Sequence, residues 1–295
     1  MDQTQAAILQ RIRDLSVWTK AGERAPHKPL LLLFALARVA QNAPRLITFN
    51  ELEIPLRSLI INYGPPRASI HPEYPFWWLQ SDGLWQVLQG TDLRRRRGGT
   101  APLKSELVSK EVQAGLPEPI YQQFHKHPAL LEKAVREILD RNFPTSLHED
   151  ILNEVGLAIS LTRLSKRDSA FRRNVIRAYA HSCAVCGFDL KIGAADFALD
   201  AAHIKWHQIG GPDEVPNGLA LCTIHHKALD RGVIGISKEA TVLLSVDLHG
   251  ATCSVEWFEN FNGKPLKKPT RAEWYPKDEY FRWHYKEVFR GPARD

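Results

Sequence analysis

One stretch decides the fold of the second half of the chain: LDAAHIKWHQIGGPDEVPNGLALCTIHHKALDRG, residues 199–232. Its pattern predicts a strand over residues 200–204 that ends around His203, then a loop with glycines and proline, and a second strand over residues 218–221. A helix is expected from about Thr223. The stretch therefore predicts two short strands and a helix that gather histidines, an asparagine and an aspartate in a small space.

The spacing within the expected helix separates two kinds of ligand. His226 and Asp230 are four residues apart and share one helix face, whereas His225 is turned about 100° away and can serve a different site. A divalent ion near His226 can polarise a phosphodiester and stabilise the departing 3′ oxygen. A neutral imidazole at His203 can take a proton from the attacking water, and Asn217 is expected to orient that imidazole. The stretch predicts phosphodiester hydrolysis with His203, Asn217 and His226 as catalytic residues.

Two residue pairs with the spacing of zinc knuckles lie beside this stretch. Cys183 and Cys186 are separated by two residues, and Cys222 and His225 repeat that spacing. Such pairs suit a tetrahedral Zn²⁺ ion that stabilises a small domain with little core. Because the chain has only four cysteines, metal binding in a reducing compartment is favoured over disulfides. Two unrelated pairs in a small core are the alternative, and Cys253 is expected to be simply buried.

Composition limits the classes of protein that fit. A chain of 295 residues is long enough for two domains of about 100 to 200 residues each. Hydrophobic residues make up 44% and charged residues 24%, and no apolar run approaches the roughly 20 residues that span a bilayer. The start of the chain has no secretion signal, so a cytoplasmic protein is expected. The net charge of +6 favours a polyanionic partner such as nucleic acid.

The first half is expected to be mainly helical with some β-structure. Helices are predicted over residues 3–18, from Pro29 to Val39, after a capping box of Asn50 and Glu53 with a break near Pro55, and over residues 117–143. The aromatic residues 74–88 predict a β-hairpin. In the second half, residues 171–181 predict a helix, and residues 233–236 and 242–246 predict strands. The expected division is a DNA-reading domain at 1–145, a linker at 146–168 and a nuclease domain at 169–295, which together form an α+β protein.

Several features of the first half are candidates for DNA recognition. His27 and Lys28 at a helix start combine positive side chains with unpaired backbone N–H groups, which together can bind an anion. Arg67 in the GPPR loop can reach the same phosphate. An aromatic cluster begins at Tyr74 and Pro75 and includes Trp78, although ordinary core packing is the alternative for such a cluster. Four consecutive arginines follow at positions 94 to 97, before two glycines: Arg94, Arg95, Arg96 and Arg97.

Residues 171–236 resemble the HNH, or ββα-metal, nuclease superfamily. The motifs that carry the resemblance are AAHI in the first strand, NGLALC in the second and HHKALDRG in the helix. The resemblance implies that His203 is the general base, Asn217 the orienting residue and His226 a ligand of a catalytic divalent ion such as Mg²⁺ or Mn²⁺. It covers about a quarter of the chain.

The chain departs from this superfamily at one ligand position. Many HNH enzymes carry an acidic ligand directly before the first histidine, where this chain has Ala202. Asp230, with Asp200 as the less favoured candidate, is expected to supply the carboxylate beside His226. A zinc-stabilised DNA-binding module without catalysis is the alternative.

The first half resembles the sulfur-binding domain of McrA-like type IV restriction endonucleases, which act on phosphorothioate-modified DNA. The order HKPLLLLFAL, YGPPR and YPFWWLQSDGLW, followed by a basic stretch, carries the resemblance. In that family an HNH nuclease follows, as it does here. The resemblance implies a pocket in which sulfur contacts Tyr74, Pro75 and Trp78, with His27, Lys28 and Arg67 near the DNA backbone. The arginines at 94–97 would read flanking bases of the duplex.

Two other functions stay open from the sequence. The first domain could read another mark, such as methylated cytosine, or only a base sequence. The protein could also be a DNA-binding regulator without nuclease activity. For a nuclease, one catalytic centre per chain and two strands to cut lead us to expect a homodimer.

Overall fold

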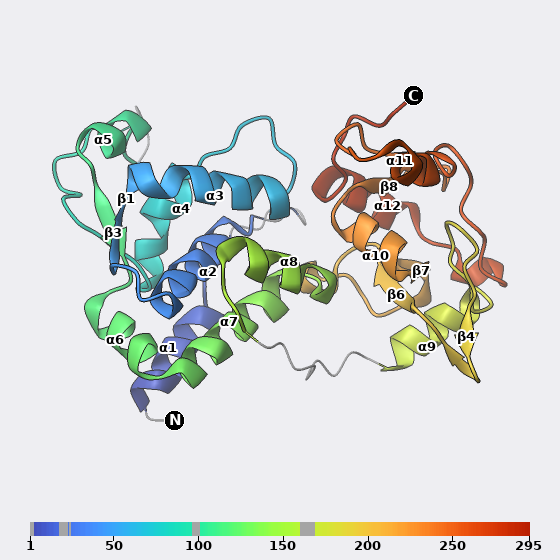
Figure 1. Ribbon diagram of the computed structural model, residues 1–295, viewed down its shortest axis with the longest axis horizontal. Helices are drawn as coiled ribbons and strands as arrows, with labels where there is room; N and C mark the ends of the chain where they lie inside the picture. Colours follow the sequence, from blue (N-terminus) through green and yellow to red (C-terminus); the bar gives the residue numbers. More distant parts are fainter. Residues whose placement is uncertain (1–2, 18–22, 24, 96–100, 160–168) are drawn as a thin grey trace. The chain divides into compact units, whose positions relative to one another are not determined.

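The computed structural model describes residues 3–17, 23, 25–95, 101–159 and 169–295, without the side chains of residues 169 and 252–254. The predictions for Arg96, Arg97 and the Cys253 side chain therefore lie outside the described residues. Contacts divide the chain into two compact units, Met1–Leu161 and Thr162–Asp295 (Figure 1). Each unit mixes helices and strands, which confirms the α+β expectation.

A central buried helix organises the first unit. Helix α2, His27–Ala40, buries four consecutive leucines, and α3, α4, α6, α7 and α8 all pack against it (Figure 1). The helices around it are α1 (Gln3–Arg13), α3 (Phe49–Tyr63), α4 (Glu73–Trp78), α5 (Lys104–Ser109), α6 (Glu118–Lys126), α7 (Pro128–Asn142) and α8 (Thr145–Val155). A helix that is apolar on all sides belongs inside a domain, so the HKPLLLLFAL segment forms the core of this unit.

A small antiparallel sheet completes the first unit. Its strands are β1 (Leu46–Thr48), β3 (Gln113–Gly115) and β2 (Gln86–Val87), in the order β1-β3-β2. The central strand β3 pairs Ala114 with both Ile47 and Val87. The sheet brings together segments that are far apart in the sequence, and it fixes the positions of α3 and α4 between its strands.

The predicted hairpin over residues 74–88 is wrong. Helix α4 is followed by the 3₁₀ helix η1, Leu79–Asp82, and only the end of the segment joins the sheet, as β2. The buried residues Phe76 and Leu79 are three apart, which is a helical spacing, and Phe76 packs edge-on against Phe49 with ring centres 5.1 Å apart. Gly83, at φ 67°, ends η1 in the left-handed conformation that favours glycine.

Two helix predictions also need correction. The capping box of α3 is formed by Thr48 and Glu51, because the Thr48 hydroxyl accepts from the Glu51 N–H at 3.3 Å and Glu51 accepts from the Thr48 N–H at 2.9 Å. The predicted cap at Asn50 lies inside the helix, and Pro55 does not break it. Residues 117–143 form two helices, because the chain leaves the helical conformation at His127 before α7 begins on a proline. Helix α8 lies in the range expected to be a linker and packs against α2, α3 and α7.

The second unit is built around one strand pair and two helices. Strands β6 (Leu199–His203) and β7 (Gly218–Cys222) are antiparallel, with His203 opposite Gly218. Helix α9 (Ser169–Ala178) packs on both strands, and α10 (Thr223–Asp230) follows β7 directly. The Cβ of any residue other than glycine at 218 would lie 2.4 Å from Val175 of α9, so glycine is needed for this close packing. The predicted order of strand, loop, strand and helix is present.

The rest of the second unit surrounds this centre. Strands β8 (Ile234–Ile236) and β9 (Val242–Leu244) form a hairpin near the predicted positions, and β4 (Lys191–Ile192) pairs with β5 (Ala195–Asp196). The remaining helices are α11 (Thr252–Glu259), α12 (Asp278–Glu287) and three 3₁₀ turns, η2 (His207–Ile209), η3 (Val215–Asn217) and η4 (Ala272–Trp274). In the described part of the chain, no helix has the length and apolar character that a membrane span requires.

Candidate DNA-reading pocket and nuclease centre

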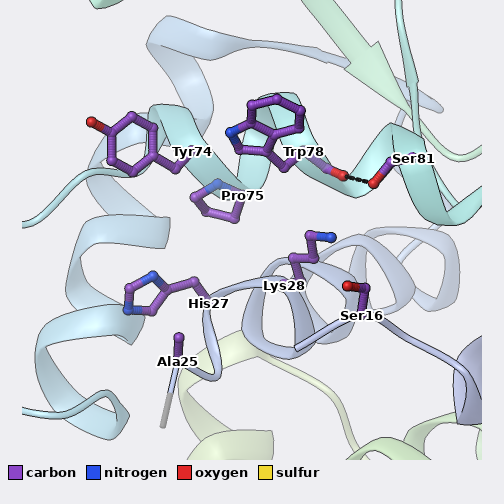
Figure 2. Close-up of a pocket in the computed structure, with 8 residues that line it drawn as sticks. All are labelled: Ser16, Ala25, His27, Lys28, Tyr74, Pro75, Trp78 and Ser81. Carbon is purple, nitrogen blue, oxygen red and sulfur yellow. Dashed lines mark hydrogen bonds between the residues drawn. The ribbon is translucent and has the colours of Figure 1, made fainter. Parts of the chain in front are cut away.

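A cavity of about 560 Å³ lies between α2 and α4 in the first unit. Figure 2 shows His27 and Lys28 at the start of α2 on one side, facing Tyr74, Pro75 and Trp78 of α4 on the other. The remaining lining residues are Ser16, Ala25 and Ser81. Five of the predicted DNA-reading residues thus line one cavity, with a cationic side opposite an apolar side.

Neighbouring residues hold both sides of this cavity in place. The Lys28 ammonium donates to Asp82 at 2.7 Å, and the second Asp82 oxygen accepts the Ser16 N–H at 2.8 Å. Both side chains of this ion pair are largely buried, with 15% of Lys28 and 6% of Asp82 exposed. The Tyr74 ring stacks on His71 with centres 4.8 Å apart. Asp82 therefore fixes the cation, although its charge also partly neutralises the cavity.

Four predicted metal ligands come together in the second unit. Cys183, Cys186, Cys222 and His225 place one ligand atom each within 4.8 Å of the others. The Cys186 and Cys222 sulfurs are 4.0 Å apart, and the His225 Nδ1 lies 3.7 Å from Cys183 and 3.3 Å from Cys222. Tetrahedral Zn²⁺ with Zn–S of about 2.3 Å and Zn–N of about 2.0 Å places such atoms roughly 3.5 to 3.8 Å apart. The quartet fits zinc in both chemistry and size.

Contacts within the quartet shift the pKa values of its thiols in opposite directions, lower for Cys183 and higher for Cys186. Neighbouring thiol groups of Cys186 and Cys222 lower the pKa of the Cys183 thiol, which favours the thiolate that binds metals. The His225 ring is fully buried and stacks on Trp257 with centres 4.6 Å apart. Its Nδ1 is the nitrogen that lies beside the sulfurs of Cys183 and Cys222, and it is therefore the one that can act as a ligand.

His203 lies at the end of β6 with its ring held on two sides. Phe171 of α9 stacks on it with ring centres 4.0 Å apart, and its Nε2 donates to the Asp213 carboxylate at 2.7 Å. His207 approaches the same Asp213 oxygen at 3.3 Å. Burial lowers the pKa of His203 and outweighs the opposing effect of Asp213. A neutral imidazole with Nε2–H bonded to a carboxylate has Nδ1 available to accept a proton.

The Asn217 side chain holds the loop between the two strands. It is fully buried, accepts the Lys205 N–H at 2.9 Å, and donates to the carbonyls of Lys205 at 2.9 Å and Pro212 at 3.0 Å. These contacts connect the residues just after His203 to the loop that carries Asp213. The side chain that bonds the His203 ring directly is that of Asp213.

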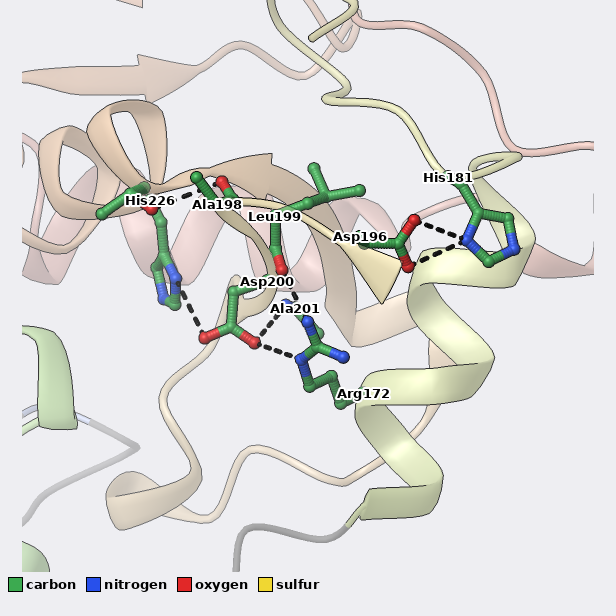
Figure 3. Close-up of polar contacts among 9 residues, drawn as sticks. Arg172, His181, Asp196, Ala198, Leu199, Asp200, Ala201 and His226 are labelled. Carbon is green, nitrogen blue, oxygen red and sulfur yellow. Dashed lines mark hydrogen bonds and ion pairs between the residues drawn. The ribbon is translucent and has the colours of Figure 1, made fainter. Parts of the chain in front are cut away.

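His226 lies between two carboxylates, of which Figure 3 shows that of Asp200. Its Nε2 is 3.2 Å from the Asp230 carboxylate, and its Nδ1 is 3.9 Å from the Asp200 carboxylate. Ligands about 2.1 Å from one octahedral ion lie roughly 3.0 Å apart at right angles, so His226 and Asp230 fit a shared divalent ion. Arg172 of α9 donates to Asp200 at 3.0 Å and holds this second carboxylate (Figure 3).

Sequence reasoning missed two side chains at this centre. Asp213 lies in the loop between the strands, and Arg172 lies on the preceding helix, 28 positions before its partner Asp200. Neither has a local spacing that relates it to the histidines. The available signal for Asp213 was its place in the segment that joins the two predicted strands, because this segment starts after His203 and returns to Gly218, which is opposite His203.

Family models match both units. The model of the ScoMcrA-like DNA sulfur-binding domain matches residues 5–160, and the model of the HNH endonuclease (HNH_2) matches residues 183–237. The first match alone covers more than half of the chain.

The chain belongs to the ScoMcrA-like DNA sulfur-binding domain family. An HNH endonuclease domain follows the sulfur-binding domain in the same chain. No match was found among curated proteins.

Solved structures of sulfur-binding domains are similar to part of this chain. The sulfur binding domain of ScoMcrA complexed with phosphorothioated DNA is 28% identical, covers 50% of this chain and 96% of that one, and has a TM-score of 0.44. The SprMcrA domain with such DNA is 22% identical over 53% and 98%, with a TM-score of 0.44. A ScoMcrA structure of the sulfur binding and SRA domains, also with such DNA, is 24% identical over 66% and 68%, with a TM-score of 0.42.

Among the described residues, the predicted arginines Arg67, Arg94 and Arg95 do not line the cavity. The Arg67 guanidinium donates to the Pro66 carbonyl at 3.1 Å and lies 3.9 Å from Glu23. Arg94 donates to Glu106 at 2.7 Å, although 80% of its side chain is exposed, and Arg95 is exposed as well. Their predicted contacts with DNA stay predictions.

Proposed function

We propose that the protein is a type IV restriction endonuclease that recognises phosphorothioate-modified double-stranded DNA and hydrolyses a phosphodiester bond near the mark. The observation that carries this proposal is the cavity lined by His27, Lys28, Tyr74, Pro75 and Trp78, in a chain that also holds an HNH domain. The first half of the proposal concerns recognition and the second concerns cutting.

Recognition of sulfur follows from the two sides of the cavity. Sulfur is larger and less strongly hydrated than the oxygen it replaces, so the apolar surface of Tyr74, Pro75 and Trp78 favours it. The phosphorothioate linkage keeps its negative charge, and Lys28 supplies a positive charge beside it. Asp82 already pairs with Lys28 and weakens the attraction of the cavity for an anion. Binding of an ordinary phosphate depends mainly on this attraction and has to replace strong hydration, so the cavity stabilises it less than the phosphorothioate. We expect Asp82 to lower the affinity for unmodified DNA.

Cutting is assigned to the residues around β6, β7 and α10. We propose that His203 accepts the proton of the attacking water at Nδ1 while Asp213 holds Nε2–H, and that Asn217 fixes the loop that carries Asp213. His226 and Asp230 would bind a divalent cation, which stabilises the charge on the phosphate and on the leaving oxygen. Asp200, held by Arg172, lies near the other nitrogen of His226 and would orient that ring. Asp230 is thus the ligand in place of the acidic residue that Ala202 replaces.

Two further parts of the proposal rest on chemistry. The quartet of Cys183, Cys186, Cys222 and His225 would bind structural Zn²⁺, because three thiols and one imidazole suit that ion. One HNH centre per chain would require two copies to cut both strands of a duplex, so we propose action as a homodimer.

Tyr74→Ala is expected to weaken binding of phosphorothioate DNA selectively. Loss of the aromatic wall removes an apolar contact that only sulfur uses well, so we expect a loss of about 1 to 3 kcal/mol, or roughly 5- to 150-fold in Kd. Binding of the unmodified duplex should hardly change. Fluorescence anisotropy on duplexes that differ only in the sulfur atom measures both, with Tyr74→Phe as the matched control that keeps the ring. Equal losses on the two duplexes would rule out the sulfur pocket.

The fall of kcat/KM for cleavage at low pH, the acidic limb of the pH profile, should depend on the protonation of His203. Because burial lowers the pKa of His203 from its ordinary value and the neutral form is the base, kcat/KM should fall only at a pH more acidic than that at which an ordinary histidine becomes protonated. Asp213→Asn removes a carboxylate that raises the pKa of His203. His203 then stays neutral to a lower pH, so the acidic limb should move to lower pH, with a lower maximal rate. His207→Ala removes a neighbour that lowers the pKa, so its limb should move the other way. If the acidic limb lies at the same pH in the parent protein, Asp213→Asn and His207→Ala, His203 is not the base whose protonation limits cleavage.

A further inference from the structure

The exposed face of α9 carries basic side chains outside the catalytic cluster. Phe171, Val175 and Ile176 of this helix are buried, whereas Arg173 and Arg177 are exposed. Within the described part of the chain, neither arginine lies within ion-pair distance of a carboxylate. In this they differ from Arg172 on the same helix, which pairs with Asp200.

A cavity of about 270 Å³ opens beside this face. Its lining consists of Asn174 and Arg177 from α9, Val215 from η3, and Arg271 and Trp274 from the segment around η4. The Arg271 guanidinium lies over the Trp274 ring, 4.7 Å from its centre, with one nitrogen 3.4 Å from Glu273. Two guanidinium groups and one amide thus line a cavity that also has apolar surface, and among the described residues Arg177 has no carboxylate partner.

The packing of the second unit places this cavity beside the general base. Phe171, which stacks on His203, is on the same helix as Asn174 and Arg177. An α-helix rises about 1.5 Å per residue, so Arg177 lies roughly 9 Å along the axis from Phe171. Val215 is two residues before Asn217, which fixes the loop beside His203. Six residues also turn the helix by about 600°, so Arg177 is about 120° around the axis from Phe171, and the cavity is too far from His203 to share its phosphate.

We propose that this cavity binds the sugar–phosphate backbone of the strand being cut, at a phosphate other than the scissile one. The proposal rests on the nuclease function and extends its substrate contacts beyond the scissile phosphate. Guanidinium groups match phosphate oxygens with paired hydrogen bonds. A sugar packs against Val215 and the exposed edge of Trp274. Holding the strand on the helix that also supports His203 sets the scissile phosphate at a fixed distance from the base.

The salt dependence of DNA binding tests this contact without requiring cleavage. In a His203→Ala background, Kd is measured from low to high salt on a phosphorothioate duplex long enough to engage both domains. Each lost phosphate contact should reduce the slope of log K against log salt by about 0.9. Arg177→Ala and Arg271→Ala should each show this decrease, and the double variant about twice as much. Arg282→Ala is the matched control, because Arg282 is an exposed arginine of α12 that pairs with Asp278.

The results distinguish a backbone contact from a structural role of Arg271 and from a base-binding pocket. Arg271→Lys keeps the positive charge, so it should recover most of the slope if Arg271→Ala acts through charge rather than through the packing of Trp274. Unchanged slopes in both alanine variants would overturn the proposal. Losses that depend on the base at one position would overturn it in favour of a base-binding pocket. Failure of the parent protein with intact His203 to cut DNA would instead overturn the nuclease function, since the slopes are measured on binding alone.

Discussion

Cys183→Ala is expected to unfold the HNH domain while the sulfur-binding domain stays folded and binds DNA. The four proposed zinc ligands join the turn after α9 to the start of α10, at the end of the β6–β7 pair where Cys222 is opposite Leu199. Zinc binding supplies roughly 10 to 16 kcal/mol of folding free energy in small zinc domains. A whole domain is usually stable by only about 5 to 15 kcal/mol. Loss of one buried thiolate ligand should therefore remove most of the stability of this domain.

Zinc content and thermal unfolding measure this effect together. We expect about one zinc per chain and a transition from each domain in the parent protein, and neither the zinc nor the HNH transition in Cys183→Ala. Cys253→Ala is the matched control, because the sequence leaves this cysteine outside the two knuckle pairs, and it should keep the zinc. A Cys183→Ala protein that retains zinc and both transitions would show that the quartet does not hold the domain together.

The sequence alone predicted the contacts that follow from local spacing. The pairs Cys183/Cys186 and Cys222/His225 converge because each is a short turn and β7 leads directly into α10. The alternation of His225 and His226 between two sites follows from the 100° step of a helix. The cavity in the first unit was expected only through the resemblance to sulfur-binding domains, since no spacing rule relates His27 to Tyr74.

Elsewhere several local patterns fitted the same residues. Asn50 with Glu53 and Thr48 with Glu51 both match the capping pattern, and the pairing of Thr48 in β1 places the helix start at the second pair. The aromatic run of α4 has a high β propensity, but its packing against α2 and α3 determines its conformation. Tertiary contacts determine the start of α3 and the conformation of α4, and these contacts cannot be recognised from the neighbouring residues in a single sequence.

The details of the catalytic centre depend on contacts between distant segments. Asp213 reaches His203 across the loop between the strands, and Arg172 reaches Asp200 from α9. The sequence placed both candidate carboxylates, Asp200 and Asp230, near His226, but only the structure separates them. Asp230 lies beside Nε2, and Asp200 lies near Nδ1 and is held by an arginine.

His203→Ala is expected to abolish most cutting while leaving DNA binding intact. Removal of a general base usually costs about 10²- to 10⁴-fold in rate. His203 lies in the second unit, whereas the proposed sulfur-binding cavity lies in the first, so the Kd for modified DNA should change little. Single-turnover cleavage and binding on the same duplex measure the two effects separately. A variant that still cuts at the parent rate would assign the chemistry to other residues.

The central claim is that one chain reads backbone sulfur and cuts DNA in response. Its most direct test is a cleavage assay with Mg²⁺ or Mn²⁺ on two duplexes that are identical except for the phosphorothioate linkages, with His203→Ala assayed beside the parent protein. We predict cutting of the sulfur-bearing duplex by the parent protein alone, and no cutting of the other duplex. Equal cutting of both duplexes, or binding of the modified duplex without any cutting by the parent protein, would contradict the account.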